Sequence, residues 1–346
     1  MSVVHTEYID PQGMRVVKTI LEGIDASTLD RTQNKRREFL LKYLGGIDTA
    51  YGPEVIGPLG IAARPLTCTY SRIRSGRLHC HMRVGPKWSD TENSYICAQG
   101  MPNVLRPYLM QKWGHDLDIE NCHVVLMYQL GSGYHKWSEH ENKLVQPLSL
   151  HMMRQLYESR DKFIAHVADF HVVDTDDCHY PGYRKDFVKP LLLRILYGGS
   201  YDAWLNEHNL FVGHKSPRVV RLERELGILR DAVLNSKRFQ WLVRPERDAQ
   251  QRRGRTREAA NRGIFSKVAQ YLECEALLAM RQYLINKGWE VHSLVFDGLI
   301  VGHRSDAELD PTAIERYVEH ETEYSVRIVE KPLYLFTPDS KRLLSA

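Results

Sequence analysis

The chain has 346 residues, of which 43% are hydrophobic and 26% charged, and its formal net charge at pH 7 is +4. This composition is typical of a globular protein, and the length is enough for one large domain or two ordinary ones. No apolar run approaches the roughly 20 residues of a membrane span, and the N-terminus lacks the basic and then apolar profile of a secretory signal. A soluble, intracellular protein is therefore the default expectation.

The cysteines are scattered along the chain and form no CxxC pair. They are Cys68, Cys80, Cys97, Cys122, Cys178 and Cys274. This usage is typical of a reducing compartment, so we expect free thiols.

The spacing of apolar residues predicts the elements in chain order. The first seventy residues contain one predicted helix, around 33–44, and a segment of strand character follows over 66–84. Apolar residues at helical spacing predict a helix over 149–170, and the chain breaks at Tyr-Pro-Gly, 180–182. Later helices are expected over 187–196, 257–287 and 311–321, a hairpin over 291–301 and a strand over 324–330.

The sequence WGHDLDIENCH, residues 113–123, carries two acids two positions apart. In a strand, Asp116 and Asp118 point to the same face because side chains alternate with a period of two. A buried face tolerates bare carboxylates only if they are paired or hold a metal. The pattern therefore indicates functional acids, and it leaves open which of the two carries the chemistry.

A further acid, Asp297, lies in the apolar sequence SLVFDGLIV, residues 293–301. The two apolar runs predict a hairpin with Asp297 and Gly298 at its turn. An isolated Asp-Gly is usually a plain turn, but these flanks predict a hairpin buried on both sides. A carboxylate presented there beside an acid-bearing strand favours a Mg²⁺ site. Two carboxylates holding two ions can activate a 3′-hydroxyl and stabilise a leaving pyrophosphate.

Two later segments carry candidate residues every four positions, which share a helix face. Lys185, Lys189, Leu193 and Tyr197 form the first set. Its lysines could hold a triphosphate and its tyrosine could stack on a base, whereas an amphipathic helix with exposed lysines is the simpler alternative. Glu258, Arg262, Ser266 and Gln270 form the second set. Such a polar stripe can face solvent or reach into a minor groove.

The stretch between residues 237 and 257 is strongly basic, with only Glu246 and Asp248 as acids. Its basic residues are Lys237, Arg238, Arg244, Arg247, Arg252, Arg253, Arg255 and Arg257. It is either a solvated loop or a positively charged surface that binds a nucleic-acid backbone.

Six segments resemble, in order and at similar intervals, the motifs of the family A DNA polymerases. SGRL (75–78) resembles TGRL, QGMPNVLRPYL (99–109) resembles PNLQNIP…R, and DIENCH (118–123) resembles DYSQIE. KPLLLRILYGGS (189–200) resembles K…NFG..YG.S, REAANRGIFSKVAQ (257–270) resembles REAAER.AFN.P.Q, and FDGL (296–299) resembles HDEL. The likeness covers about residues 75–335 and is greatest to the divergent branch found in transposons and large DNA viruses.

The resemblance implies roles for the matched residues. The family's catalytic acid precedes an amide at +3 and a sugar-sensing residue at +5, which fits Asp118, Asn121 and His123; Asp116 then supports the strand or a nearby base. Asp118 and Asp297 would bind two Mg²⁺ ions, with Mn²⁺ as a substitute, and Lys189 would be catalytic. Nucleotide contacts are implied for Lys185, Lys189, Leu193, Tyr197, His123 and Asn121. Nucleic-acid contacts are implied for Arg77, Arg106, Arg252, Arg253, Arg255, Arg262, Ser266 and Gln270.

The implied fold is an α/β right-hand polymerase with a palm sheet, helical fingers and a reduced thumb. Residues 1–74 would form an N-terminal region or reduced thumb, 75–180 the first part of the palm, 181–256 the fingers and 257–346 the second part of the palm. Fewer than eighty residues precede SGRL and no acidic exonuclease motif is evident. We therefore expect a reduced polymerase without proofreading.

The chain departs from the family at positions that affect substrate choice. His123 replaces the glutamate that excludes ribose, and Leu193 replaces the aromatic residue that packs on the nucleotide. Phe296 and Gly298 replace the His and Glu around the third-motif acid, and Ser266 replaces an Asn. Pro190 directly follows Lys189, so the helix is expected to start or kink there.

The leading functional hypothesis is a template-directed DNA polymerase with primer–template DNA and dNTPs as substrates. An RNA polymerase or primase of the same fold is the alternative, with rNTPs or an RNA template. A catalytically inactive nucleic-acid-binding subunit is a third hypothesis. A helicase or a processivity factor is a candidate partner, and no membrane partner is expected.

Overall fold

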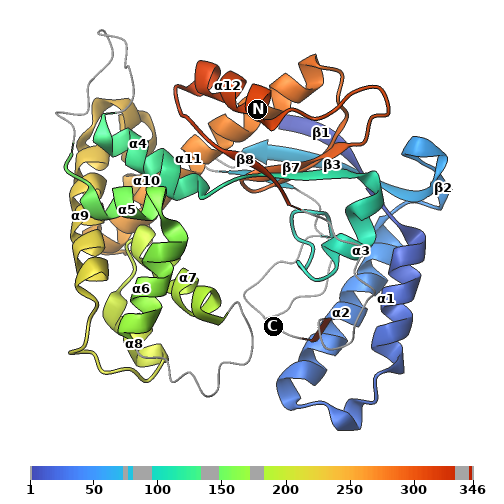
Figure 1. The fold of residues 1–346 in the computed structure, drawn as a ribbon, viewed down its shortest axis with the longest axis horizontal. Helices are drawn as coiled ribbons and strands as arrows, with labels where there is room; N and C mark the ends of the chain where they lie inside the picture. The colour runs from blue at the N-terminus through green and yellow to red at the C-terminus, as the bar shows by residue number, and fades with distance from the viewer. Residues whose placement is uncertain are drawn as a thin grey trace. The chain divides into compact units, whose positions relative to one another are not determined.

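A computed structural model describes residues 2–72, 77–80, 96–133, 148–171, 183–331 and 343–344 (Figure 1). The chain divides into two compact units, each built from separate segments. The first contains Met1–Glu120, Cys274–Thr322 and Arg327–Ala346, and the second contains Asn121–Glu273 and Glu323–Val326. The described strands all belong to the first unit, where they form antiparallel sheets together with helices. The second unit is built from helices. This mixed architecture agrees with the expected combination of sheet and helices.

One sheet of the first unit is formed near the N-terminus. Its strands are β1 (Ser2–Ile9), β2 (Val55–Ile56), β3 (Ala62–Arg72) and β4 (Leu78–Cys80), and β3 pairs antiparallel with the other three. Helices α1 (Pro11–Gly23) and α2 (Arg31–Ala50) lie side by side (Figure 1). Each starts at an aspartate whose side chain caps the first turn, Asp10 for α1 and Asp30 for α2.

The other sheet of the first unit has the strand order β6-β7-β5-β8 and is entirely antiparallel. Its strands are β5 (Gly114–Ile119), β6 (Val291–Val295), β7 (Gly298–Gly302) and β8 (Ile328–Lys331). All residues of β6 and β7 are buried, which confirms the predicted buried hairpin. Helix α12 (Pro311–Thr322) packs on β8, and α3 (Arg106–Met110) precedes β5.

The second unit is helical. It contains α4 (Cys122–Ser132), α5 (His151–Glu158), α6 (Arg160–Phe170), α7 (Tyr183–Leu196), α8 (Tyr201–Glu207), α9 (Pro217–Asn235) and α10 (Gln240–Arg252). Helix α5 packs against α4 and α9, and α7 packs against α6, α8 and α9. The long helix α11 (Arg257–Asn286) contributes its residues up to Glu273 to this unit.

Several predicted elements are confirmed, and others were wrong. Helices α2, α7, α11 and α12 cover the predicted ranges 33–44, 187–196, 257–287 and 311–321 almost completely. The predicted helix 149–170 is two helices, because Ser159 has φ −149° and ψ 52°, outside the helical region, and α5 and α6 pack on different neighbours. The predicted final strand begins only at Ile328. Helix α7 does not start at Lys189, since it runs from Tyr183 to Leu196 with Pro190 inside it, and the alternative of a kink at Pro190 stays a prediction. The predicted break at 180–182 lies outside the described residues.

Two findings concern the protein class. The five cysteines within the described residues are buried and form no disulfide, as expected, and Cys178 lies outside those residues. In the described part of the chain, no helix combines the length and the apolar character that crossing a bilayer requires.

Candidate active site

The two proposed metal-binding acids lie at the same end of the β6-β7-β5-β8 sheet. Asp118 is the second-last residue of β5, and its backbone pairs with Gly298, which directly follows Asp297. The Ile119 N–H donates a hydrogen bond to the Asp297 carbonyl at 3.1 Å. The strand pairing thus brings together two acids that are far apart in the sequence. The Asp118 side chain is 15% exposed, and Asp297 is half-buried in the hairpin turn.

The hairpin turn is one residue earlier than predicted. Phe296 and Asp297 form it, and Gly298 is already the first residue of β7, where it pairs with Val295. Phe296 has a φ of 56°, a conformation that side-chain-bearing residues rarely adopt and that often accompanies functional sites. Gly298 is required for another reason. A Cβ at this position would lie 2.4 Å from the Leu117 carbonyl oxygen, so glycine allows β5 and β7 to approach.

We expect Gly298→Ala to destabilise the first unit by about 1–3 kcal/mol, because the added methyl group overpacks the β5–β7 contact. Urea unfolding of the full chain measures the change. Gly45→Ala is the matched control, since a Cβ at Gly45 of α2 meets no atom within 4 Å. That control should gain roughly 0.5–1 kcal/mol from the better helix propensity of alanine. An unfolding free energy for Gly298→Ala equal to that of the wild type would contradict the close approach.

Asp116, the other acid of β5, has a more enclosed environment than Asp118. It is 6% exposed, and its backbone pairs with Ile300 on one side and Lys331 on the other. Burial raises the pKa of Asp116, although the charges of Arg106 and Lys331 act in the opposite direction. Arg106, which sequence analysis assigned to nucleic acid, also donates a hydrogen bond to the Ala98 carbonyl at 3.3 Å.

Lys331 is a residue of this site that sequence analysis missed. Its ammonium nitrogen lies 2.6 Å from Asp118 Oδ2, and its side chain is half exposed. Only the pairing of β5 with β8 brings it there, so no local sequence signal could have found it. The contact shows that the Asp118 carboxylate is open to a cation. Among the residues that the structure describes, no three His, Cys, Asp or Glu side chains are grouped to hold a metal by themselves.

Arg77 lies beside the same hairpin. Its guanidinium carbon is 5.1 Å from the centre of the Phe296 ring, a cation–π arrangement, and Phe296 is 38% exposed. An arginine and an exposed aromatic ring are therefore held next to Asp297. Both groups have the chemistry to contact a nucleic-acid strand through its phosphates and its sugar or base faces.

In the second unit, α7 carries the proposed triphosphate-binding residues. Lys189 is exposed and Leu193 is 42% exposed, whereas the side chain of Lys185 lies outside the described residues. Tyr197 directly follows α7, where its N–H donates to the Leu193 carbonyl at 3.1 Å. The exposed positions of α7 leave the Lys189 ammonium accessible to an anion.

A buried polar contact joins His123, Tyr197 and Glu273. His123 Nδ1 is hydrogen-bonded to the Tyr197 hydroxyl, and His123 Nε2 lies 2.6 Å from Glu273 Oε2. His123 is 7% exposed and Glu273 is 1% exposed. Sequence analysis identified the histidine and the tyrosine but missed Glu273, which lies three residues after Gln270 on α11 and continues no motif.

Asn121 introduces α4 in a left-handed conformation, with a φ of 52°. Among the described residues, no group hydrogen-bonds its buried side-chain oxygen Oδ1. An unsatisfied buried acceptor costs about 1–3 kcal/mol unless a donor reaches it. The Asn121 side-chain oxygen can therefore accept a hydrogen bond from a bound molecule.

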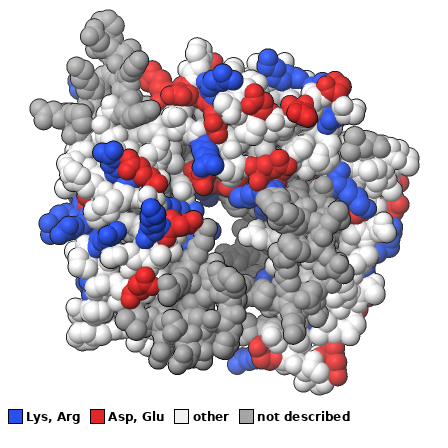
Figure 2. Space-filling model, viewed as in Figure 1, with Lys and Arg blue, Asp and Glu red and all other residues white. Residues whose placement is uncertain are grey.

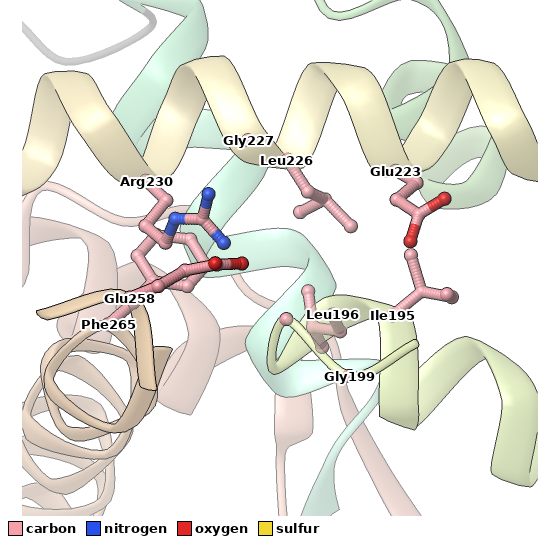
Figure 3. Close-up of a pocket in the computed structure, with 10 residues that line it drawn as sticks. Ile195, Leu196, Gly199, Glu223, Leu226, Gly227, Arg230, Glu258 and Phe265 are labelled. Carbon is pink, nitrogen blue, oxygen red and sulfur yellow. The ribbon is translucent and has the colours of Figure 1, made fainter. Parts of the chain in front are cut away.

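The turn after α7 borders a pocket of the second unit (Figure 3). Gly198 has a φ of 76°, and a Cβ there would lie 2.7 Å from Arg262 Cγ, so Arg262 packs on the glycine backbone. Arg230 from α9 and Glu258 from α11 extend into the pocket, and Gly199 forms part of its wall. The pocket places charged groups beside the Tyr-Gly-Gly turn that resembles the second polymerase motif.

The polar stripe of α11 is paired along the helix. Arg262 Nη1 lies 2.8 Å from Glu258 Oε1, and the Gln270 amide donates a hydrogen bond to Ser266 Oγ at 3.4 Å. Arg262, Ser266 and Gln270 are half-buried, whereas Glu258 is exposed. The stripe is thus a row of donors and acceptors on one helix face.

The basic stretch 237–257 is mostly helix rather than a loop. Helix α10 buries Leu242 and Val243, and this amphipathic pattern directs most of its charged residues outward. Arg252, Arg253 and Arg255 follow one another at its exposed end. On the face drawn in Figure 2, by contrast, the described Lys and Arg side chains are interspersed with Asp and Glu. A cluster of arginines is therefore a local feature of a surface with mixed charge.

Replacing Arg252, Arg253 and Arg255 by Gln should weaken binding to all DNA sequences similarly and flatten its salt dependence. Each lost phosphate contact on duplex DNA lowers the slope of log K against log salt by about 0.9. Fluorescence anisotropy at several salt concentrations measures the slope. Gln at Arg221 and Arg224, two exposed arginines of α9, controls for the loss of charge itself. An unaltered slope in the triple variant would make these arginines a solvated surface only.

No family model matches the chain, but it is similar to proteins of known name or structure, including the following two. It is 24% identical over 256 residues to a putative helicase, V13, of the Sputnik virophage, covering 71% of this chain and 29% of that protein. It is also similar to the POL domain of Pol1 from M. smegmatis, solved in complex with a DNA primer-template and dNTP. That similarity has a TM-score of 0.48 at 15% identity and covers 86% of this chain and 51% of the other. The chain thus spans less than a third of the virophage protein and about half of the Pol1 chain.

Proposed function

We propose that the protein is a template-directed DNA polymerase of the family A type, which adds dNTPs to a primer 3′-hydroxyl by two-metal-ion nucleotidyl transfer. The observation that carries the proposal is the β5–β7 pairing, which aligns Asp118 with Gly298 beside Asp297. Two accessible acids at one sheet end are the arrangement that this chemistry requires. In this proposal the β6-β7-β5-β8 sheet is the palm, α7 belongs to the fingers, and no proofreading activity is present.

The acids fit a pair of Mg²⁺ or Mn²⁺ ions. The contact of Asp118 with the Lys331 ammonium shows a carboxylate that accepts a cationic partner. Mg²⁺ commonly binds through one or two carboxylates and completes its coordination with water and substrate phosphates. When bound, the ions would activate the primer hydroxyl and stabilise the leaving pyrophosphate. Asp118 and Asp297 would hold them, with Asp116 enclosed behind Asp118.

The other candidate residues have the chemistry to bind nucleotide and nucleic acid. Lys189 would bind the triphosphate, assisted by Lys185, and Leu193 and Tyr197 would contact the base. His123 would lie beneath the sugar, and Asn121 would accept a hydrogen bond. Contacts with primer–template DNA are proposed for Arg77, Arg106, Arg252, Arg253, Arg255, Arg262, Ser266 and Gln270. A helicase or processivity factor is a proposed partner.

An RNA polymerase or primase is the second candidate function, and one observation favours it. The position of the family's ribose-excluding glutamate is occupied by His123. Imidazole is of similar size but can donate as well as accept a hydrogen bond. We therefore expect a DNA polymerase whose sugar selection is weaker than a tight steric gate would give.

Primer extension tests the proposal. The full chain is incubated with dNTPs or rNTPs, on DNA or RNA templates, with and without a primer and with Mg²⁺, Mn²⁺ or EDTA. We expect metal-dependent extension of a DNA primer that prefers dNTPs. A preference for rNTPs, or synthesis without a primer, would favour the second candidate. Binding of template without any incorporation would favour a catalytically inactive subunit.

A further inference from the structure

Glu273 is a buried acid to which no role has yet been assigned. It lies on α11 in the second unit and is 1% exposed. A buried carboxylate is costly unless a charged or hydrogen-bonding partner compensates for its lost hydration. Its partner is His123 of α4, whose Nε2 is 2.6 Å from Glu273 Oε2. The acid therefore acts on a residue of the proposed nucleotide site.

The contact extends from His123 to Tyr197. The Tyr197 hydroxyl is hydrogen-bonded to His123 Nδ1, and the two rings meet edge to face with their centres 5.5 Å apart. The three residues come from α11, α4 and the end of α7, all in the second unit. Tyr197 is the least buried of these three residues, so it is the one that a bound nucleotide can contact.

The separation between the histidine and the acid defines where the imidazole proton lies. At 2.6 Å the negative charge of the carboxylate favours a proton on Nε2, although the two atoms lack the alignment of a hydrogen bond. In the neutral ring Nδ1 then has the lone pair, and the Tyr197 hydroxyl donates to it. Nδ1 is thereby engaged by the Tyr197 hydroxyl and Nε2 lies against the Glu273 carboxylate, so neither ring nitrogen is directed at a ligand.

We propose that Glu273 is a positioning residue for sugar selection, acting through His123 on Tyr197. The inference rests on the proposed polymerase function, since it concerns the sugar of the incoming nucleotide. A 2′-hydroxyl that reaches the imidazole meets a ring with neither nitrogen directed at it, and it loses its hydrogen bonds to water without replacement. Glu273 thus makes His123 a barrier to ribose rather than a partner for it. Without Glu273 the imidazole is free to turn and bind the 2′-hydroxyl.

Three variants separate this role from a purely structural one. Glu273→Met keeps the length of the side chain but removes the acceptor, and Glu273→Gln keeps an acceptor for the Nε2 proton. Glu275→Gln is the matched control, because Glu275 is on the same helix and its carboxylate pairs with Arg72 at 2.6 Å. The measurement is the ratio of kcat/KM for dATP to kcat/KM for ATP on one primed template, with kcat and KM determined separately.

We expect Glu273→Met to lower the ratio about tenfold, the change that corresponds to about 1.4 kcal/mol, mainly through a lower KM for ATP. Glu273→Gln should restore the ratio to near the wild-type value, and Glu275→Gln should leave it unchanged. His123→Ala should also raise ribonucleotide use, since it removes the barrier. Extension by Glu273→Met with a wild-type ratio would overturn the inference. Absence of incorporation by the wild-type chain would instead overturn the polymerase function on which the inference rests.

A second measurement tests the proton position without any activity. Nitrogen NMR of the full chain labelled in its histidine rings distinguishes the two neutral tautomers, and the His123 signals are identified by their loss in His123→Asn. We expect the Nε2–H tautomer in the wild type and in Glu273→Gln, and its loss in Glu273→Met. An Nδ1–H tautomer in the wild type would overturn the inference even if the protein polymerises DNA.

Discussion

Asp118→Ala and Asp297→Ala should each abolish nucleotide incorporation while leaving template binding nearly intact. Each carboxylate is proposed to hold the ions that stabilise the reacting oxygens, a contribution of several kcal/mol to the transition state. Because about 1.4 kcal/mol corresponds to a factor of ten in rate, a loss of roughly a thousandfold or more is expected. Single-turnover incorporation on a primed template measures the rate, and fluorescence anisotropy measures template affinity.

The controls for this prediction use neighbouring residues of the same sheet. Asp118→Asn keeps the shape of the side chain and should be as inactive as Asp118→Ala, which separates loss of charge from loss of packing. Lys331→Met removes the ion-pair partner of Asp118 and shows whether that contact is needed for stability. Substantial incorporation by Asp118→Ala would transfer the catalytic role to Asp116.

Lys189→Ala should lower the rate of incorporation more than it lowers template affinity. Lys189 is exposed on α7, and its ammonium is proposed to contact the triphosphate. A charge-assisted hydrogen bond contributes about 1.5–3 kcal/mol, which corresponds to roughly a 10- to 150-fold lower rate if it is made in the transition state. Charge that develops during phosphoryl transfer would strengthen this contact. Single-turnover rates over a range of dNTP concentrations separate the rate constant from nucleotide affinity.

The matched control is Lys162→Ala, which removes an exposed lysine from α6 of the same unit. It should change neither the rate nor the affinity. Unchanged turnover of Lys189→Ala together with weaker DNA binding would show that α7 faces the duplex rather than the nucleotide.

The elements that could be predicted from sequence are those whose signal is local. Helices α2 and α11 have apolar residues at helical spacing, and the β6–β7 hairpin has two continuous apolar runs around a turn. The break at Ser159 could not be predicted, because the apolar spacing continues across it and only the packing of α5 and α6 on different helices requires it. The predicted position of the hairpin turn was wrong by one residue, because Asp-Gly is a strong local turn signal. In the structure, Gly298 instead allows the close approach of β7 to β5.

The candidate acids and their possible chemistry could be read from the sequence alone, since residue types and motif spacing are local properties. Amino-acid sequence by itself thus determined the buried hairpin and the long helices, and it named the candidate acids. Tertiary structure alone decided which residues meet: Asp118 with Gly298, Asp118 with Lys331, and His123 with Glu273. Strand register and helix packing join residues that are distant in the chain, and the free energy of these contacts depends on the whole core rather than on any local pattern. For that reason neither Lys331 nor Glu273 carried a signal in the sequence.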